Sequence, residues 1–297
     1  HVDGVDFAIS MEEAKKLLEE DKEEYVIPLK ITHPAVTTDK IGSEGFPDLL
    51  GEFSTTYNAG ATARTTNLKL ASNKINTVVM PGETFSYNKV VGKRTVAAGY
   101  KEAPAYAGGK VVNDIGGGIC QITSTLYNAV ILAELEVTER SNHSMIVTYV
   151  KPSMDAAIAG DYKDLKFVNN QDVPIYIEGY TSGKNVYFNI YGEETRPANR
   201  KVTYESEVVS EQDPGTQFVA TGDPVGTMSV SQGKHVGYVA QLWKVVTVNG
   251  VEESREVFNK STYKASPKIV NVGTASEDPN ASATIGAALA TGDEGTI

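Results

Sequence analysis

The chain has 297 residues, of which 40% are hydrophobic and 22% charged, enough for two or three folded domains with a sizeable core. Its 27 basic and 38 acidic side chains give a formal net charge of -11. This balance argues against a nucleic-acid partner, because binding to a phosphate backbone requires a basic patch. No run reaches the roughly 18 apolar residues that a bilayer span requires, and no signal peptide is visible at the start. The sequence begins at His1 without a methionine, so we interpret it as an excised or processed piece. Any membrane anchor would then lie outside it.

Cysteine and histidine are scarce. The single cysteine, Cys120, cannot form an internal disulfide or a thiolate metal site. The four histidines are scattered without the spacing of metal ligands. We therefore expect neither a metal nor a cofactor.

Residues 1–42 are predicted to be the end of a small α/β unit. Ser10 and Glu13 form a capping box for a helix that ends before Tyr25. The run from Tyr25 to Ile31 then predicts a strand. A linker is expected near residues 39–43.

A second unit is expected over residues 43–196. Apolar residues at helical spacing predict one helix over about 68–76 and another that begins near Cys120, directly after the glycines at 116–118. Loops around short strands are predicted for residues 88–113. Strands are predicted over 78–80, 145–150, 164–169, and 173–180, the last pairing with 186–191.

The remainder of the chain has a different texture. Residues 200–273 alternate strand-like stretches with glycine turns and show no helical pattern, which predicts a separate, elongated all-β module. Residues 274–297 contain four acidic residues and no basic one, and we expect a disordered tail. The predicted fold class is α+β, with a cysteine-bearing helix packed on strands in the central domain.

Cys120 is the candidate nucleophile. A thiol reacts as the thiolate, and the N–H groups at a helix N-terminus lower its pKa. The glycines before it allow a substrate to approach closely, and N–H groups there, including that of Cys120, could hold an oxyanion. His143 is the candidate base, at the point where we expect a strand to begin. Asp155 and Asp164 are candidates to orient it, although each also fits a carboxylate at a turn or a strand end. The alternative for Cys120 is a buried, small hydrophobic residue without chemistry.

Candidate substrate contacts lie near the cysteine. Arg64 is predicted either to bind a substrate carboxylate through its fork of donors or to form an internal salt bridge. Gln121 and Ser124 lie within about one helical turn of Cys120 and either face the site or support the helix. Gly117 and Gly118 are the glycines expected to contact substrate.

Residues 53–191 resemble a VanW domain, and the resemblance covers nearly half of the chain. The matching blocks are FST at 53–55, Arg64 with Asn67, PGETFSYN at 81–88, GGGICQITSTLYNA at 116–129, ERSNHS at 139–144 and DLKFVNN at 164–170. Residues 1–42 resemble the end of the peptidoglycan-binding-like domain that often precedes VanW domains. Residues 200–273 resemble a G5 domain. The matching blocks also add Ser144 to the candidate substrate contacts.

The resemblance implies an extracellular L,D-transpeptidase of a Gram-positive type of cell wall, at the wall or the outer face of the cytoplasmic membrane. Cys120 would attack the carbonyl between the third and fourth residues of a peptidoglycan stem and form a thioester, with His143 as base and acid and Asp155 as the third member. The amine of a second stem would then complete a 3–3 cross-link. The implied partners are donor and acceptor stem peptides and, for the G5 domain, glycan that contains N-acetylglucosamine. The alternatives are a non-catalytic wall-binding protein, or an L,D-carboxypeptidase or cysteine hydrolase of wall peptides.

Overall fold

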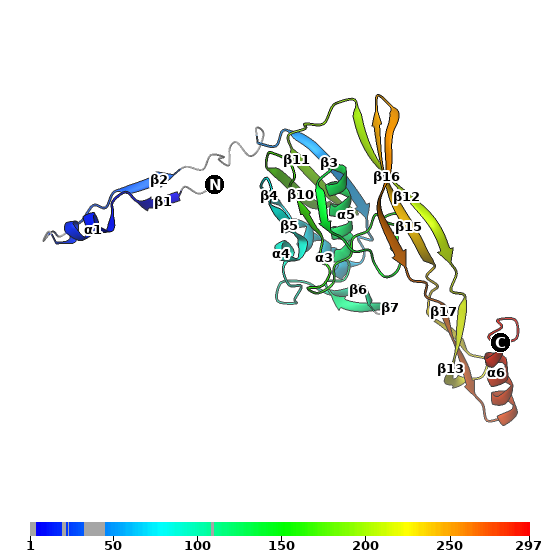
Figure 1. The fold of residues 1–297 in the computed structure, drawn as a ribbon. Helices are drawn as coiled ribbons and strands as arrows, with labels where there is room; N and C mark the ends of the chain where they lie inside the picture. Colours follow the sequence, from blue (N-terminus) through cyan, green and yellow to red (C-terminus); the bar gives the residue numbers. More distant parts are fainter. Residues whose placement is uncertain (1–3, 20–21, 23, 33–44, 108–109) are drawn as a thin grey trace. The chain divides into compact units, whose positions relative to one another are not determined.

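The computed structural model describes residues 4–19, 22, 24–32, 45–107 and 110–297, and it divides into two compact units, His1–Asp48 and Leu49–Ile297 (Figure 1). In the first unit a helix lies between two paired antiparallel strands: β1 (Gly4–Phe7), α1 (Met11–Leu18) and β2 (Leu29–Thr32). The predicted capping box is present, because Ser10 accepts the Glu13 N–H and the Glu13 carboxylate accepts the Ser10 N–H. β2 is shorter than the predicted strand, and β1 was not predicted. The expected linker at 39–43 lies outside the described residues.

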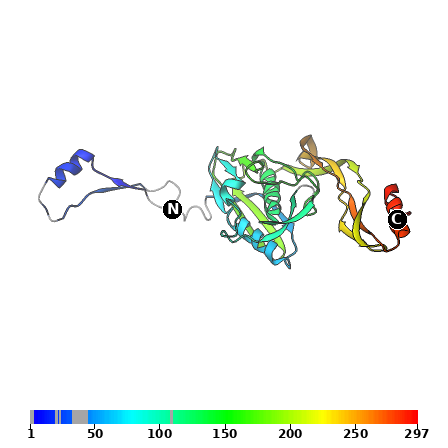
Figure 2. The same cartoon turned by 90° about the horizontal axis from the view of Figure 1, so that it is seen from below.

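The second unit is built on a four-stranded sheet in the order β3-β11-β10-β4, against which two helices, α3 and α5, pack (Figures 1 and 2). Strands β10 and β11 form the predicted antiparallel hairpin. Val186, Phe188 and Ile190 alternate along β11 and are fully buried, which gives the sheet one apolar face. The bounds are β3 (Asp48–Thr56), α3 (Thr62–Asn73), β4 (Thr77–Val79), α5 (Ile119–Leu132), β10 (Ile175–Ser182) and β11 (Asn185–Gly192).

Helix α5 is almost entirely buried. Of its 14 residues, only Cys120 and Leu132 are not buried. The hydroxyls of Thr123, Ser124 and Thr125 donate to the carbonyl oxygens four residues earlier, so these polar side chains are satisfied inside the core. The helix predicted to begin near Cys120 begins one residue before it.

The prediction of a strand over residues 145–150 is wrong. The strand in this part of the chain is β8, which ends before His143, and the described residues from Arg140 to Leu165 contain only an isolated bridge between Ala159 and Lys163. Met145 and Val147 are buried by packing of the loop, so their apolar character does not reflect strand pairing. The other elements are β5 (Thr84–Ser86), α4 (Tyr87–Val91), β6 (Glu102–Ala107), β7 (Lys110–Ile115), β8 (Glu136–Glu139) and β9 (Lys166–Val168). β5, β9 and β8 form a sheet, and β6 pairs with β7.

Residues 200–273 form two three-stranded sheets without a helix, in the orders β12-β15-β16 and β13-β17-β14. All their pairings are antiparallel except β13 with β17. The bounds are β12 (Arg200–Gln212), β13 (Thr216–Pro224), β14 (Met228–Gln232), β15 (Gly237–Val248), β16 (Val251–Tyr263) and β17 (Lys268–Ala275).

The tail differs from the prediction of disorder, because it contains helix α6 (Pro279–Thr291). Asp278 caps this helix through the Asn280 N–H, Pro279 opens it, and Gly292 ends it in the left-handed conformation. Its alanines favour helix, and it contacts β13 and β17, as Figure 1 shows. Among the described residues, no helix combines the length and the apolar character needed to cross a membrane.

Candidate functional site

The three glycines before Cys120 are required by the backbone. Gly116 and Gly118 have φ of 85° and 99°, a region that residues with a side chain rarely adopt. Gly117 passes so close to the chain that an added Cβ would lie 2.1 Å from the Ala103 carbonyl oxygen. The glycines thus deliver the chain into α5, and Cys120 is the second residue of the helix.

Cys120 faces His143. The thiol is partly buried, and its Sγ lies 3.6 Å from the carbonyl oxygen of Ile158. Burial on its own would raise the pKa of Cys120, but a hydrogen bond with His143 and the charge of that histidine outweigh it, so the pKa lies below its ordinary value. These two contacts therefore favour the thiolate more than in a free cysteine.

Asp155 holds the other side of His143. Its Oδ2 lies 2.6 Å from His143 Nδ1 and also accepts the His143 backbone N–H at 2.7 Å. Asp155 is fully buried, and His143 is 7% exposed. Burial would lower the pKa of His143, but hydrogen bonds with Asp155 and Cys120 raise it to about 9. The two shifts act in the same sense, because each favours the charged form of its side chain: thiolate for Cys120 and imidazolium for His143.

Asp164, the other candidate, does not reach His143. It accepts the Ser86 hydroxyl at 2.5 Å and the Asn88 N–H at 2.9 Å, and so it holds the start of α4. The structure therefore brings Cys120 and Asp155 to the same histidine, His143, and leaves Asp164 as a structural carboxylate.

Arg64 lies beside the N-terminus of α5. Its Nη1 donates to Gln121 Oε1 at 2.9 Å, and its side chain covers Gly118, where an added Cβ would lie 2.8 Å from Arg64 Cγ. Burial lowers the pKa of Arg64. No carboxylate among the described residues forms an ion pair with it, so the expected internal salt bridge is absent from the part of the chain that the structure describes.

Three other predicted substrate contacts lie behind the site. Gln121 is buried and donates to Thr55 and to the Thr56 carbonyl oxygen. Ser124 is also buried, and it donates to the carbonyl oxygens of Cys120 and Ala156. Because these two side chains have no exposed surface and Gly117 is packed against Ala103, none of the three is placed to touch substrate. Ser144 is exposed, beside His143.

Tyr149 is a member of the site that the sequence analysis missed. Its hydroxyl lies 3.4 Å from His143 Nε2, and the two rings meet edge to face at 6.3 Å. Burial, and then the nearby Cys120, raise the pKa of Tyr149 well above its ordinary value. It lies in the irregular loop after His143, where no spacing pattern could identify it.

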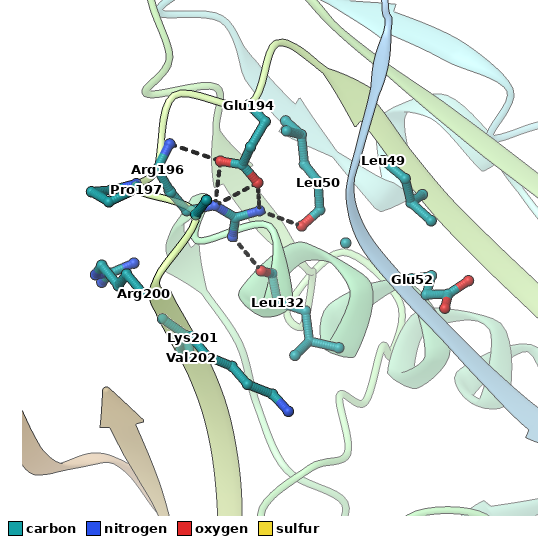
Figure 3. A pocket seen from close by; sticks show the side chains of 12 residues that line it. Leu49, Leu50, Glu52, Leu132, Glu194, Arg196, Pro197, Arg200, Lys201 and Val202 are labelled. Carbon is teal, nitrogen blue, oxygen red and sulfur yellow. Dashed lines mark hydrogen bonds and ion pairs between the residues drawn. The ribbon is translucent and has the colours of Figure 1, made fainter. Parts of the chain in front are cut away.

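A cavity of about 420 Å³ lies elsewhere, at the other end of α5 (Figure 3). Leu132 lines it, whereas Cys120 is 12 residues earlier, a separation of roughly 18 Å along the helix. Arg196, which points across the cavity, donates to Glu194 and to the carbonyl oxygens of Leu50 and Leu132. The Arg196 guanidinium thus links Glu194 to strand β3 and helix α5, and we do not place the catalytic site in this cavity.

Comparison with known proteins agrees with this organisation. Residues 63–191 match the family model of VanW like protein, and residues 199–275 match that of the G5 domain. The chain is 41% identical over 143 residues to the uncharacterized protein YoaR of Bacillus subtilis (strain 168), covering 48% of this chain and 47% of that protein. It is 33% identical over 113 residues to the vancomycin B-type resistance protein VanW of Enterococcus faecalis (strain ATCC 700802 / V583), covering 36% of this chain and 41% of that protein. The chain therefore spans less than half the length of these relatives.

Two solved structures of G5 domains each match about a quarter of the chain. One is the G5 domain of IgA1 protease, with 29% identity and a TM-score of 0.19 over 26% of this chain and 94% of that one. The other is HP0197-G5, with 17% identity and a TM-score of 0.14 over 25% of this chain and 99% of that one. TM-scores this low carry no weight for the fold, and the assignment of this region rests on the family match. The resemblances to VanW and G5 are confirmed, and that of residues 1–42 stays a prediction. The chain carries a VanW-like domain followed by a G5 domain.

Proposed function

We propose that this chain is a cell-wall-associated L,D-transpeptidase that uses a cysteine nucleophile to form 3–3 cross-links in peptidoglycan. The observation that carries the proposal is Cys120 at the N-terminus of a buried helix, with His143 beside its thiol and Asp155 hydrogen-bonded to His143. A thiol that served only as a small apolar side chain would not need a buried imidazole–carboxylate pair beside it. The VanW match and the similarity to a vancomycin B-type resistance protein support a role at the wall.

In the first half-reaction, the Cys120 thiolate attacks the carbonyl carbon between the third and fourth residues of a donor stem. The oxyanion that forms accepts a hydrogen bond from the Cys120 N–H, because the N–H groups of Ile119 and Gln121 already donate to the carbonyl oxygens of Gly116 and Gly118. His143, as imidazolium, donates its proton to the leaving nitrogen. The C–N bond breaks, D-Ala departs with a neutral amine, and the donor stays on Cys120 as a thioester.

In the second half-reaction, the side-chain amine of an acceptor stem attacks the thioester carbonyl. The neutral His143 takes the proton from this amine, the C–S bond breaks, and the thiolate and imidazolium return. Water in place of the amine would give a carboxypeptidase by the same steps. Arg64, whose guanidinium faces no carboxylate in the described structure, is suited to bind the terminal carboxylate of the donor.

The test is mass spectrometry of purified disaccharide-tetrapeptide incubated with the protein, beside a Cys120→Ala control. We expect loss of D-Ala together with a cross-linked dimer, and neither product with the control. Shortened monomers without dimers would show that the protein hydrolyses the stem peptide and does not cross-link it. Unchanged substrate with folded protein would reject both and favour a wall-binding role.

A further inference from the structure

The end of strand β16, in the G5 domain, contacts the loop that carries His143 and Asp155. Alternate residues of a strand share a face, and Asn259, Ser261 and Tyr263 therefore point to the same side. All three hydrogen-bond to the VanW-like domain. Asn259 donates to the Tyr127 hydroxyl at 2.7 Å, and Ser261 Oγ accepts a hydrogen bond from Arg140 Nη1 at 3.0 Å.

Tyr263 reaches the site itself. Its hydroxyl donates to Asp155 Oδ1 at 2.5 Å and accepts the backbone N–H of Ser153 at 2.7 Å. Arg140 Nη2 donates to the same Oδ1 at 3.1 Å, while Oδ2 accepts both hydrogen bonds from His143. Both carboxylate oxygens of Asp155 thus accept hydrogen bonds from the VanW-like domain, and Oδ1 also accepts one from the G5 domain. Burial, and then the charge of Asp155, raise the pKa of Tyr263, so its hydroxyl stays protonated and remains a donor.

A β-bulge sets the direction of these side chains. Leu242 of β15 pairs with Asn259 of β16, but the next residue, Trp243, pairs with Val257, so Phe258 is the extra residue. A shift of one residue moves every following side chain to the other face of a strand, and without the bulge Tyr263 would point away from Asp155. Phe258 is itself anchored, since its ring meets that of Tyr204 edge to face at 5.1 Å.

We propose that Tyr263 is a positioning residue of the candidate site and that the G5 domain, through this strand end, completes the site of the VanW-like domain. This inference rests on the proposed function for its consequence in catalysis. Tyr263 holds Asp155 in the orientation in which Oδ2 faces His143, and His143 in turn holds its Nε2 side toward Cys120. The G5 domain would then be more than a wall-binding spacer, because loss of this one contact would weaken the chemistry.

The test measures the rate of alkylation of Cys120 by iodoacetamide against pH, in the full chain. Because the chain has one cysteine, the mass increase reports on that residue alone. The variants are Tyr263→Phe and Tyr238→Phe. Tyr238 is a matched control: it pairs with Tyr263 across β15 and β16, and none of the hydrogen bonds among the described residues joins it to the site.

We expect Tyr263→Phe to be alkylated about tenfold more slowly than the wild type at pH 6.5, which is the effect of losing one hydrogen bond to a charged group. The increase of the alkylation rate with pH should occur at a higher pH than in the wild type. The reason is that a released Asp155 no longer raises the pKa of His143, so both the imidazolium and the thiolate are depleted near neutral pH. Rates should converge at pH 9.5, and Tyr238→Phe should follow the wild type throughout. A purely structural contact would lower the melting temperature without displacing this profile.

Profiles of Tyr263→Phe and Tyr238→Phe that coincide would overturn the inference. If Tyr263→Phe does not fold, Ser261→Ala, which frees Arg140 from β16, should displace the profile in the same direction, and no displacement there would also overturn it. Alkylation does not depend on transpeptidation. A displaced profile in a protein that releases no D-Ala would keep the positioning role and reject the proposed function, whereas cross-linking with an undisplaced profile would do the reverse.

Discussion

Glu134 makes a strong test of how the two domains hold together. It follows α5 directly, and it is 13% exposed. Arg200 of the G5 domain donates to both of its carboxylate oxygens, and Lys244 Nζ lies 2.8 Å from Oε1. Burial would raise the pKa of Glu134, but these two cations outweigh it and lower the pKa to about 2. We expect Glu134→Gln to destabilise the folded chain at neutral pH.

The size of the expected destabilisation follows from the pKa of Glu134. A carboxyl whose pKa falls from its ordinary 4.5 to about 2 on folding contributes about 3 kcal/mol. Since the group retains some contact with solvent, we expect about 2 kcal/mol, which corresponds to a fall in melting temperature of about 4–8 °C for a unit of this size. Because the folded-state pKa is the lower one, this stabilisation is complete above pH 4.5 and is lost as the pH falls towards 2. At pH 3, roughly 40% of it should remain.

The assay is thermal unfolding of wild type and Glu134→Gln at pH 7 and pH 3, beside Glu252→Gln. Glu252 is the control because its ion pair with Arg255 is exposed, and a surface pair of this kind contributes little to stability. The difference between wild type and Glu134→Gln should shrink by more than half at pH 3. An equal difference at both pH values, or one no larger than that of Glu252→Gln, would refute the reasoning.

Three further predictions concern the site. Arg64→Gln should raise KM for the tetrapeptide donor about 10-fold or more with little change in kcat, measured by D-Ala release, and an unchanged KM would remove Arg64 from substrate binding. Gly117→Ala should lower stability by at least about 2 kcal/mol, because the new Cβ would meet the Ala103 carbonyl oxygen, whereas Gly233→Ala, with open space around it, should melt like the wild type. Transpeptidation should decline as the pH rises through about 9, where His143 loses the proton that the proposed mechanism transfers to the leaving amine. A rate that keeps rising to pH 10 would contradict this assignment.

The local elements of the fold could be predicted from the sequence. The capping box at Ser10, the helix at Cys120 and the hairpin of β10 with β11 each depend on residues close together in the chain. The failed strand over 145–150 shows the limit of such patterns, because its apolar residues are buried by a loop. In the same way, a composition typical of disorder did not predict that α6 has β13 and β17 to pack on.

The residues of the site likewise differ in how far the local sequence predicts them. Cys120 and His143 could be proposed from residue type and the glycine-to-helix transition, and Asp155 could be proposed only beside Asp164, since their spacing does not distinguish them. Tyr263 could not be proposed at all. It is 108 residues from Asp155, and the direction of its side chain depends on a β-bulge that the local sequence does not predict.

The burial of α5 has a consequence for the order in which the site would open. Backbone amides in a helix whose side chains are enclosed on every face exchange their hydrogens only when the whole domain unfolds, whereas irregular loops open in smaller fluctuations. Cys120 lies on this buried helix, whereas His143 lies on a loop held largely by side-chain hydrogen bonds. We therefore expect deuterium to enter residues 141–150 long before 122–130. The nucleophile would lose its base through a local opening while its own helix remained intact, so the reactivity of the site would respond to heat or denaturant before the fold does.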